Sequence, residues 1–112
     1  MPQPVTHFEI HGKDGKRLQQ FYASLFDWNV DANNPMEYGM VSGSDGGIGG
    51  GITKDERSMV TFYVSVPDLN AALKKAESLG GTTVQPPMDV PGGPSVAMFS
   101  DPEGNQIGLV KT

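Results

Sequence analysis

The sequence has no cysteine, no long apolar run and no excess of positive charge. Without cysteine, the chain has no disulfide, no thiolate nucleophile and no zinc–sulfur site. No stretch approaches the roughly 20 apolar residues of a membrane-spanning helix, and the N-terminal residues lack the apolar segment of a signal peptide. A formal net charge of -5 argues against nucleic acid, because phosphate binding needs a basic surface. We therefore expect a soluble, cytoplasmic protein that binds neither nucleic acid nor membrane.

The second half of the sequence repeats the plan of the first half. Asp14 in the first half corresponds to Asp68 in the second, a spacing of 54 residues, and each precedes an apolar stripe with helical periodicity. A period near 50 residues is typical of tandem supersecondary units that share one core. We predict one domain over residues 1–112, with a first module over about 5–53 and a second over about 59–111.

Each module reads as strand, helix and three further strands, in the order βαβββ. Aspartate is a preferred residue at a helix N-cap, so both helices are predicted to begin just after an aspartate. The first helix carries an apolar stripe of Leu18, Phe21, Tyr22, Leu25 and Phe26, and the second buries Leu69, Ala72, Leu73, Ala76 and Leu79. The predicted fold is α+β: two tandem βαβββ modules form a cupped mixed β-sheet with two outer helices.

The first strand carries an unusually polar face. Side chains alternate between the two faces of a strand, so His7, Glu9 and His11 share one face and the apolar residues share the other. The corresponding residues of the repeat are Thr61, Tyr63 and Ser65. These six residues are the predicted ligand-binding residues, and no catalytic residue is assigned.

The residues leave alternatives open for each of these side chains. His7 either binds substrate or moves a proton, or else it is an inherited position satisfied by a hydrogen bond at the strand end. Glu9 either pairs with a neighbouring histidine, or acts as a base or as a contact to a cationic ligand. Tyr63 either contacts a ligand or is a core tyrosine. The glycines Gly49, Gly50 and Gly51 allow close backbone approach, at a strand edge or at a dimer contact, or leave space for a ligand.

The repeat and the closing segment Asp101-Pro-Glu-Gly-Asn-Gln-Ile-Gly-Leu-Val110 resemble the glyoxalase/bleomycin-resistance/dioxygenase superfamily, the vicinal oxygen chelates. The resemblance implies a cup of eight strands, and in metal-dependent members one side chain from each of four strands binds a divalent ion. The matching positions here are His7, Gly49, Thr61 and Gly108. Only one of them is a good ligand, whereas a catalytic metal needs about three. We therefore predict no metal and no other cofactor. A homodimer is also implied by the resemblance.

The favoured function is metal-independent binding of a small organic molecule in the cup, for example sequestration of an antibiotic or a metabolite. The alternative is a lyase- or isomerase-type enzyme of this superfamily that uses acid–base residues of the cup. A structural or regulatory dimer with a vestigial cup is a third class. The sequence leaves open whether a reaction is catalysed.

Overall fold

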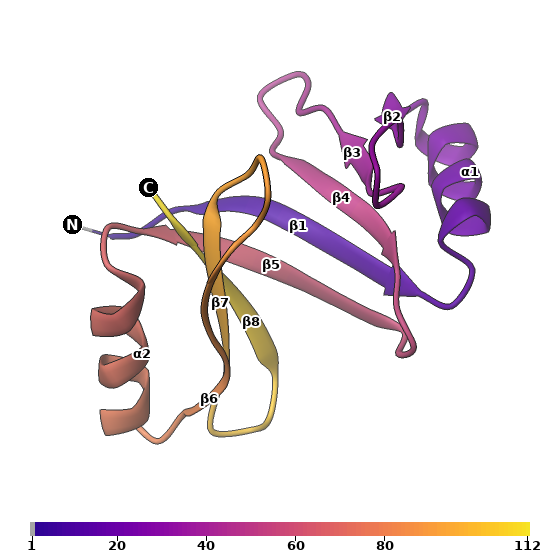
Figure 1. Ribbon diagram of the computed structural model, residues 1–112. Helices are drawn as coiled ribbons and strands as arrows, with labels where there is room; N and C mark the ends of the chain where they lie inside the picture. The colour runs from indigo at the N-terminus through magenta and orange to yellow at the C-terminus, as the bar shows by residue number, and fades with distance from the viewer. Residues whose placement is uncertain (1) are drawn as a thin grey trace. The chain divides into compact units, whose positions relative to one another are not determined.

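A computed structural model describes residues 2–112 as eight strands and two helices in two compact units. The N-terminal unit spans residues 7–61, and the C-terminal unit spans residues 62–112 together with the residues up to Thr6. The elements run in the order β1 (Val5–Gly12), α1 (Gly15–Phe26), β2 (Val30–Asp31), β3 (Gly39–Val41), β4 (Gly49–Lys54), β5 (Met59–Val66), α2 (Leu69–Ser78), β6 (Thr82–Asp89), β7 (Ser95–Ser100) and β8 (Gln106–Lys111) (Figure 1).

The strands of each half follow the same pattern of pairing. In the first half the order is β2-β3-β4-β1, with β1 parallel to β4 and the other pairs antiparallel. In the second half the order is β5-β8-β7-β6, with β5 parallel to β8 and the other pairs antiparallel. The predicted α+β class with a mixed sheet and two helices is confirmed. Of the alternatives for Gly49–Gly51, a position at the edge of the sheet is excluded, because β4 lies between β3 and β1.

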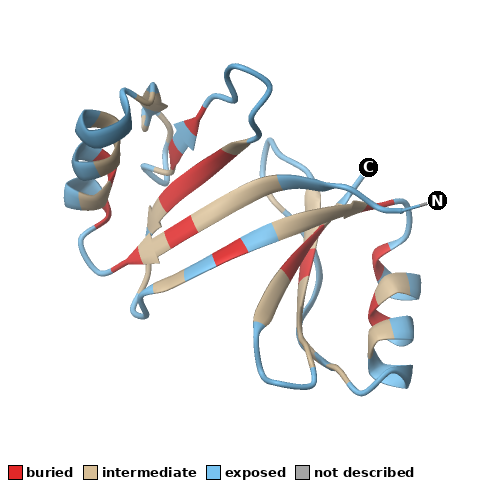
Figure 2. Ribbon diagram, turned by 180° about the vertical axis from the view of Figure 1, so that it is seen from behind, coloured by how far each residue is buried: buried red, intermediate tan, exposed pale blue. Residues whose placement is uncertain are grey.

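Each unit has its own small core. In the N-terminal unit, Ile10, Val41 and Ile52 are buried, and Phe8, Leu18, Tyr22, Trp28 and Val30 pack against them. In the C-terminal unit the buried cluster is Val66, Leu69, Leu73, Ala97 and Leu109. Figure 2 shows buried positions on the strands and on single faces of the helices. The core therefore comes from strand alternation and from narrow helix stripes.

Helix α1 begins as predicted, but its buried face differs from the predicted stripe. Asp14 is the N-cap, and its side chain accepts a hydrogen bond of 3.1 Å from the backbone N–H of Arg17. Phe21, Leu25 and Phe26 are 56%, 57% and 52% exposed, whereas Gln19 is only 8% exposed. The Gln19 amide is buried because its Nε2 donates to the carbonyl oxygens of Ile52 and Glu37, at 2.9 and 3.0 Å.

Helix α2 also begins where the sequence predicts. Asp68 is the N-cap and accepts a hydrogen bond of 3.0 Å from the N–H of Ala71. Leu69 and Leu73 are buried, but Leu79 is 70% exposed because it is the C-cap and lies beyond the last helical turn. Gly80 then takes a left-handed φ of 102°, a common way to end a helix. Neither helix in the part of the protein described by the structure is long and apolar enough to cross a membrane.

Candidate functional site: a polar network in the N-terminal unit

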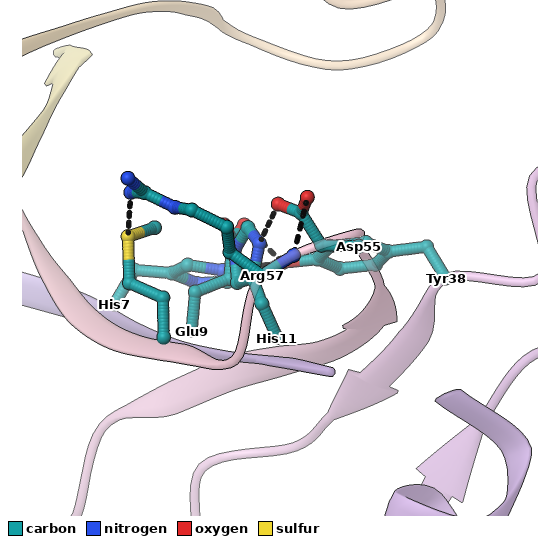
Figure 3. A network of polar contacts seen from close by, with 7 residues as sticks. His7, Glu9, His11, Tyr38, Asp55 and Arg57 are labelled. Carbon is teal, nitrogen blue, oxygen red and sulfur yellow. Dashed lines mark hydrogen bonds and ion pairs between the residues drawn. The ribbon is translucent and has the colours of Figure 1, made fainter. Parts of the chain in front are cut away.

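Five polar side chains of the N-terminal unit are hydrogen-bonded in series (Figure 3). His7 Nε2 lies 2.9 Å from Tyr38 Oη, and the Tyr38 hydroxyl donates to Glu9 Oε2 at 2.8 Å. The other carboxylate oxygen of Glu9 lies 2.6 Å from His11 Nε2, and His11 Nδ1 lies 2.8 Å from Asp55 Oδ2. We call these residues, His7, Tyr38, Glu9, His11 and Asp55, the polar network.

Three different segments supply the polar network. Strand alternation on β1 places His7, Glu9 and His11 on one face, as predicted, and all three are half-buried. Tyr38 comes from the connection between β2 and β3. Asp55 directly follows β4, where its backbone N–H donates to the carbonyl of Gly12 at 2.9 Å.

The backbone around Tyr38 is fixed by two amide side chains. The Asn34 side chain accepts from the N–H of Tyr38 at 2.9 Å and donates to its carbonyl at 2.8 Å. Gln19 donates to the carbonyl of the preceding residue, Glu37, which has a left-handed φ of 53°. A left-handed φ is uncommon outside glycine, so these contacts hold a turn that delivers Tyr38 onto the sheet.

The glycines of β4 and β8 make room for aromatic rings. A Cβ atom on Gly51 would lie 1.7 Å from Tyr38 Oη, and one on Gly50 would lie 2.5 Å from the ring of Phe8. In the C-terminal unit, a Cβ on Gly108 would lie 2.5 Å from the ring of Tyr63. Aromatic rings that cover glycines compensate for the missing side chains in a sheet. The space over these glycines is therefore filled by the protein's own side chains.

The hydrogen-bond directions assign protons within the polar network. The single Tyr38 proton goes to Glu9, since a carboxylate only accepts. The Tyr38 oxygen must then accept from His7 Nε2–H, so neutral His7 carries its lone pair on Nδ1. His11 faces a carboxylate at each ring nitrogen, and only the imidazolium form donates to both.

The pKa shifts agree with this assignment. Burial lowers the pKa of His7 and outweighs the nearby charge of Glu9, which favours the neutral imidazole. Burial also opposes protonation of His11, but the hydrogen bonds to Asp55 and Glu9 and their negative charges outweigh it, so the pKa of His11 is raised. The hydrogen bond from His11 lowers the pKa of the Asp55 carboxyl. The two histidines of the site thus have pKa values that move apart.

Of the alternatives for Glu9, pairing with a neighbouring histidine is observed, since Glu9 contacts His11. Neither Asp55 nor Tyr38 is among the six ligand-binding residues predicted from the sequence. Asp55 and Tyr38 lie 44 and 31 residues from their histidine partners. The alternation of residues within β1 cannot predict contacts at that separation. The three polar side chains on one face of β1 indicated only that these side chains would need hydrogen-bond partners.

The other three predicted residues lie on β5, and their role as ligand contacts stays a prediction. Thr61 is buried at 4% exposure. The ring of Tyr63 packs on Gly108, as a core tyrosine does. The hydroxyl of Ser65 lies 3.1 Å from that of Thr112.

The residues at the positions that resemble a metal site do not fit a metal ion. His7 stands opposite Gly49 in the β1–β4 ladder, and neither Gly49 nor Gly108 has a side chain to donate. Between residues 2 and 112, no group of three or more His, Asp or Glu side chains is arranged to hold a metal ion. The Nε2 atom of His7 is instead hydrogen-bonded to the Tyr38 hydroxyl.

The repeated βαβββ order, the mixed sheet and the polar face of β1 define an α+β protein of the glyoxalase type. The model of the Glyoxalase-like domain family matches residues 7–110, so the chain belongs to this family.

Known proteins with related sequence or fold support this assignment. The anthracycline biosynthesis protein DauV of Streptomyces sp. strain C5 is 27% identical over 123 aligned positions, which cover 92% of this chain and 45% of that protein. The chain thus spans less than half the length of this curated relative. Methylmalonyl-CoA epimerase from Mycobacterium tuberculosis has a similar fold, with a TM-score of 0.69 at 13% identity over 96% of this chain and 86% of that one. The Mn(II)-bound glyoxalase from Novosphingobium aromaticivorans superposes with a TM-score of 0.67 at 15% identity, over 98% of this chain and 40% of that one.

Proposed function

We propose that this protein binds a small organic molecule, without a metal ion, at the polar network of its N-terminal unit. The observation that carries the proposal is the burial of charge there: the side chains of Glu9 and His11 are each only 12% exposed. Removing two charged groups from water costs free energy that their mutual attraction does not always return, so a buried ion pair is weak evidence of a stabilising role. We attribute the network to ligand recognition.

The names of similar proteins support a small organic ligand. One relative takes part in anthracycline biosynthesis, and one protein of similar fold is an epimerase of methylmalonyl-CoA. This chain spans less than half the length of DauV. A role for this protein in anthracycline biosynthesis therefore belongs to the proposal. The homodimer that the family resemblance implies is also part of the proposal. Analytical ultracentrifugation of the purified protein tests it.

The pairing within the network changes the expected ligand. A lone carboxylate at Glu9 favours a cationic ligand, but Glu9 is paired with the His11 imidazolium. For binding, positive charge on the ligand is therefore less important than hydrogen-bonding groups that match the imidazole of His7 and the other polar side chains of the network.

A second candidate function is acid–base catalysis of the lyase or isomerase type. The observation that favours it is the opposite direction of the two histidine pKa shifts, lowered for His7 and raised for His11. Such a divergence gives one neutral base and one protonated acid at the same pH. His7 is the proton acceptor in this scheme, and the protonated His11 is paired with Glu9.

The binding proposal is tested by a thermal-shift screen of small organic molecules that includes an anthracycline, followed by calorimetric titration of each hit. Glu9→Gln should weaken binding at least about tenfold, because tenfold corresponds to about 1.4 kcal/mol and a hydrogen bond to a charged group contributes about 1.5–3 kcal/mol. Glu103→Gln, the same change in an exposed turn, should bind as the wild type does. Equal affinity of Glu9→Gln and wild type for every hit would place the ligand elsewhere.

The two candidate functions are separated by the fate of the ligand. A ligand that is recovered unchanged after incubation in D2O supports sequestration, whereas deuterium incorporation or a new product supports acid–base catalysis. Metal independence is tested by elemental analysis of protein purified without chelator. Near-equimolar Mn, Fe, Ni or Zn that disappears in His7→Ala would overturn it.

A further inference from the structure

The Tyr38 hydroxyl occupies a central place in the polar network. It contacts His7 on one side and Glu9 on the other, at 2.9 and 2.8 Å (Figure 3). The phenol ring lies on the backbone of Gly51, where any Cβ would collide with it. Gly51 is in register with Glu9 across the β1–β4 ladder, so the empty position beside Glu9 is the one that Tyr38 fills.

The Asp55 end of the network is more open to water than the middle of the network. The Asp55 side chain is 42% exposed, whereas those of Glu9 and His11 are 12% exposed. Asp55 is therefore the member best placed to meet bulk water, and neighbouring members of the network lie within hydrogen-bonding distance of each other, at 2.6–2.9 Å.

From this geometry we propose that Tyr38, which lies on Gly51, is the positioning residue that joins His7 to Glu9 and makes the polar network a proton relay between His7 and the partly exposed side chain of Asp55. The proposal builds on the acid–base candidate of the proposed function. It adds a residue that acts through others and gives the proton a route to water.

Proton transfer along this route is balanced. A proton taken up at Nδ1 of His7 is matched by transfer of the Nε2 proton of His7 to the Tyr38 oxygen and of the Tyr38 proton to Glu9. Once Glu9 is protonated, its negative charge no longer stabilises the His11 imidazolium. His11 then releases its Nδ1 proton to Asp55, which passes it to water. One proton enters at Nδ1 of His7 and one leaves at Asp55, and the reverse sequence takes up a proton at Asp55 and releases one from Nδ1 of His7.

The relay requires the tautomer of His7 that has its proton on Nε2, and nitrogen NMR reports this directly. The 15N chemical shifts of His7 and His11 are measured at one fixed pH in wild type, Asp55→Asn, Tyr38→Phe and the double variant. We expect wild-type His7 to carry its proton on Nε2. We expect Asp55→Asn to shift the nitrogen resonances of His7 in the wild-type background and to leave them unchanged in the Tyr38→Phe background.

Two further variants separate positioning from a general loss of structure. Gly51→Ala should displace the phenol and reproduce the Tyr38→Phe result. Tyr22→Phe makes the same chemical change in the core beside Trp28, outside the network, and should transmit the effect of Asp55→Asn as the wild type does. The backbone amide spectrum of each variant shows whether it is folded.

The proposal is overturned if wild-type His7 carries its proton on Nδ1. It is equally overturned if Asp55→Asn shifts His7 to the same extent with and without the Tyr38 hydroxyl, since the coupling is then electrostatic and passes through space. No ligand is needed, so failure to find a ligand counts against the proposed function alone, and loss of the NMR coupling counts against the relay alone.

Discussion

Replacing Gln19 with alanine should cost much of the stability of the N-terminal unit and should loosen the turn that carries Tyr38. Gln19 is 8% exposed, and its amide nitrogen donates to two backbone carbonyls, one on β4 and one on Glu37. The residue therefore links α1 to the sheet and to the segment just before Tyr38.

The magnitude follows from these two bonds. Each hydrogen bond contributes about 1 kcal/mol net, and a buried carbonyl left without a partner costs about 1–3 kcal/mol. Partial access of water to the Glu37 carbonyl, which lies on an exposed residue, reduces the second cost. We expect Gln19→Ala to lower the free energy of unfolding by about 2–4 kcal/mol, a large fraction of the roughly 5–15 kcal/mol typical of a domain.

Equilibrium urea denaturation measures this loss, with the slope m expected to stay the same. Gln20→Ala, an adjacent exposed glutamine on the same helix, is the matched control and should change stability by less than about 0.5 kcal/mol. A loss below about 1 kcal/mol for Gln19→Ala would show that the two carbonyls find other partners and that Gln19 does not hold the Tyr38 turn.

Three further predictions concern caps, pH and the core. Asp14→Ala and Asp68→Ala should each lower the free energy of unfolding by about 1 kcal/mol, and an unchanged denaturation midpoint in either would argue against that cap. The difference in free energy of unfolding between wild type and Asp55→Asn should be greatest between pH 3.8 and 6.5, which are the ordinary pKa values of Asp and His. The difference should shrink as pH falls through the lowered pKa of Asp55 or rises through the raised pKa of His11, and a difference independent of pH in thermal melts would contradict the ion pair. Phe8→Ala should cost about 3 kcal/mol in urea denaturation, the lower end for a phenylalanine because Phe8 is half-buried, and a loss under about 1 kcal/mol would remove Phe8 from the core.

The elements most accurately predicted are those with a local cause. An aspartate before an apolar stripe marks a helix start through a hydrogen bond to an amide three residues on, as Asp14 and Asp68 do. Strand alternation likewise placed His7, Glu9 and His11 on one face of β1. Both rules depend on neighbours within a few residues, so the sequence contains all that they need.

The helix faces were less well predicted, because the sheet decides which residues are covered. Phe21 and Leu25 continue an apolar stripe, yet they are exposed, while polar Gln19 is buried by the two carbonyls that its amide satisfies. Periodicity reports which residues share a face, and hydropathy alone does not report which hydrogen-bond acceptors the opposite surface offers.

The sequence by itself determined the α+β class, the repeated order of elements, the helix starts and the polar strand face, because local sterics, capping and alternation act over short separations. The tertiary structure alone decided which distant groups complete that face. Tyr38 and Asp55 reach β1 only after β4 has paired with β1 and left Gly51 open beside Glu9. Contacts between residues 31 and 44 positions apart depend on the strand register and on the turn at Glu37. Neither can be predicted from the spacing of these residues in the sequence.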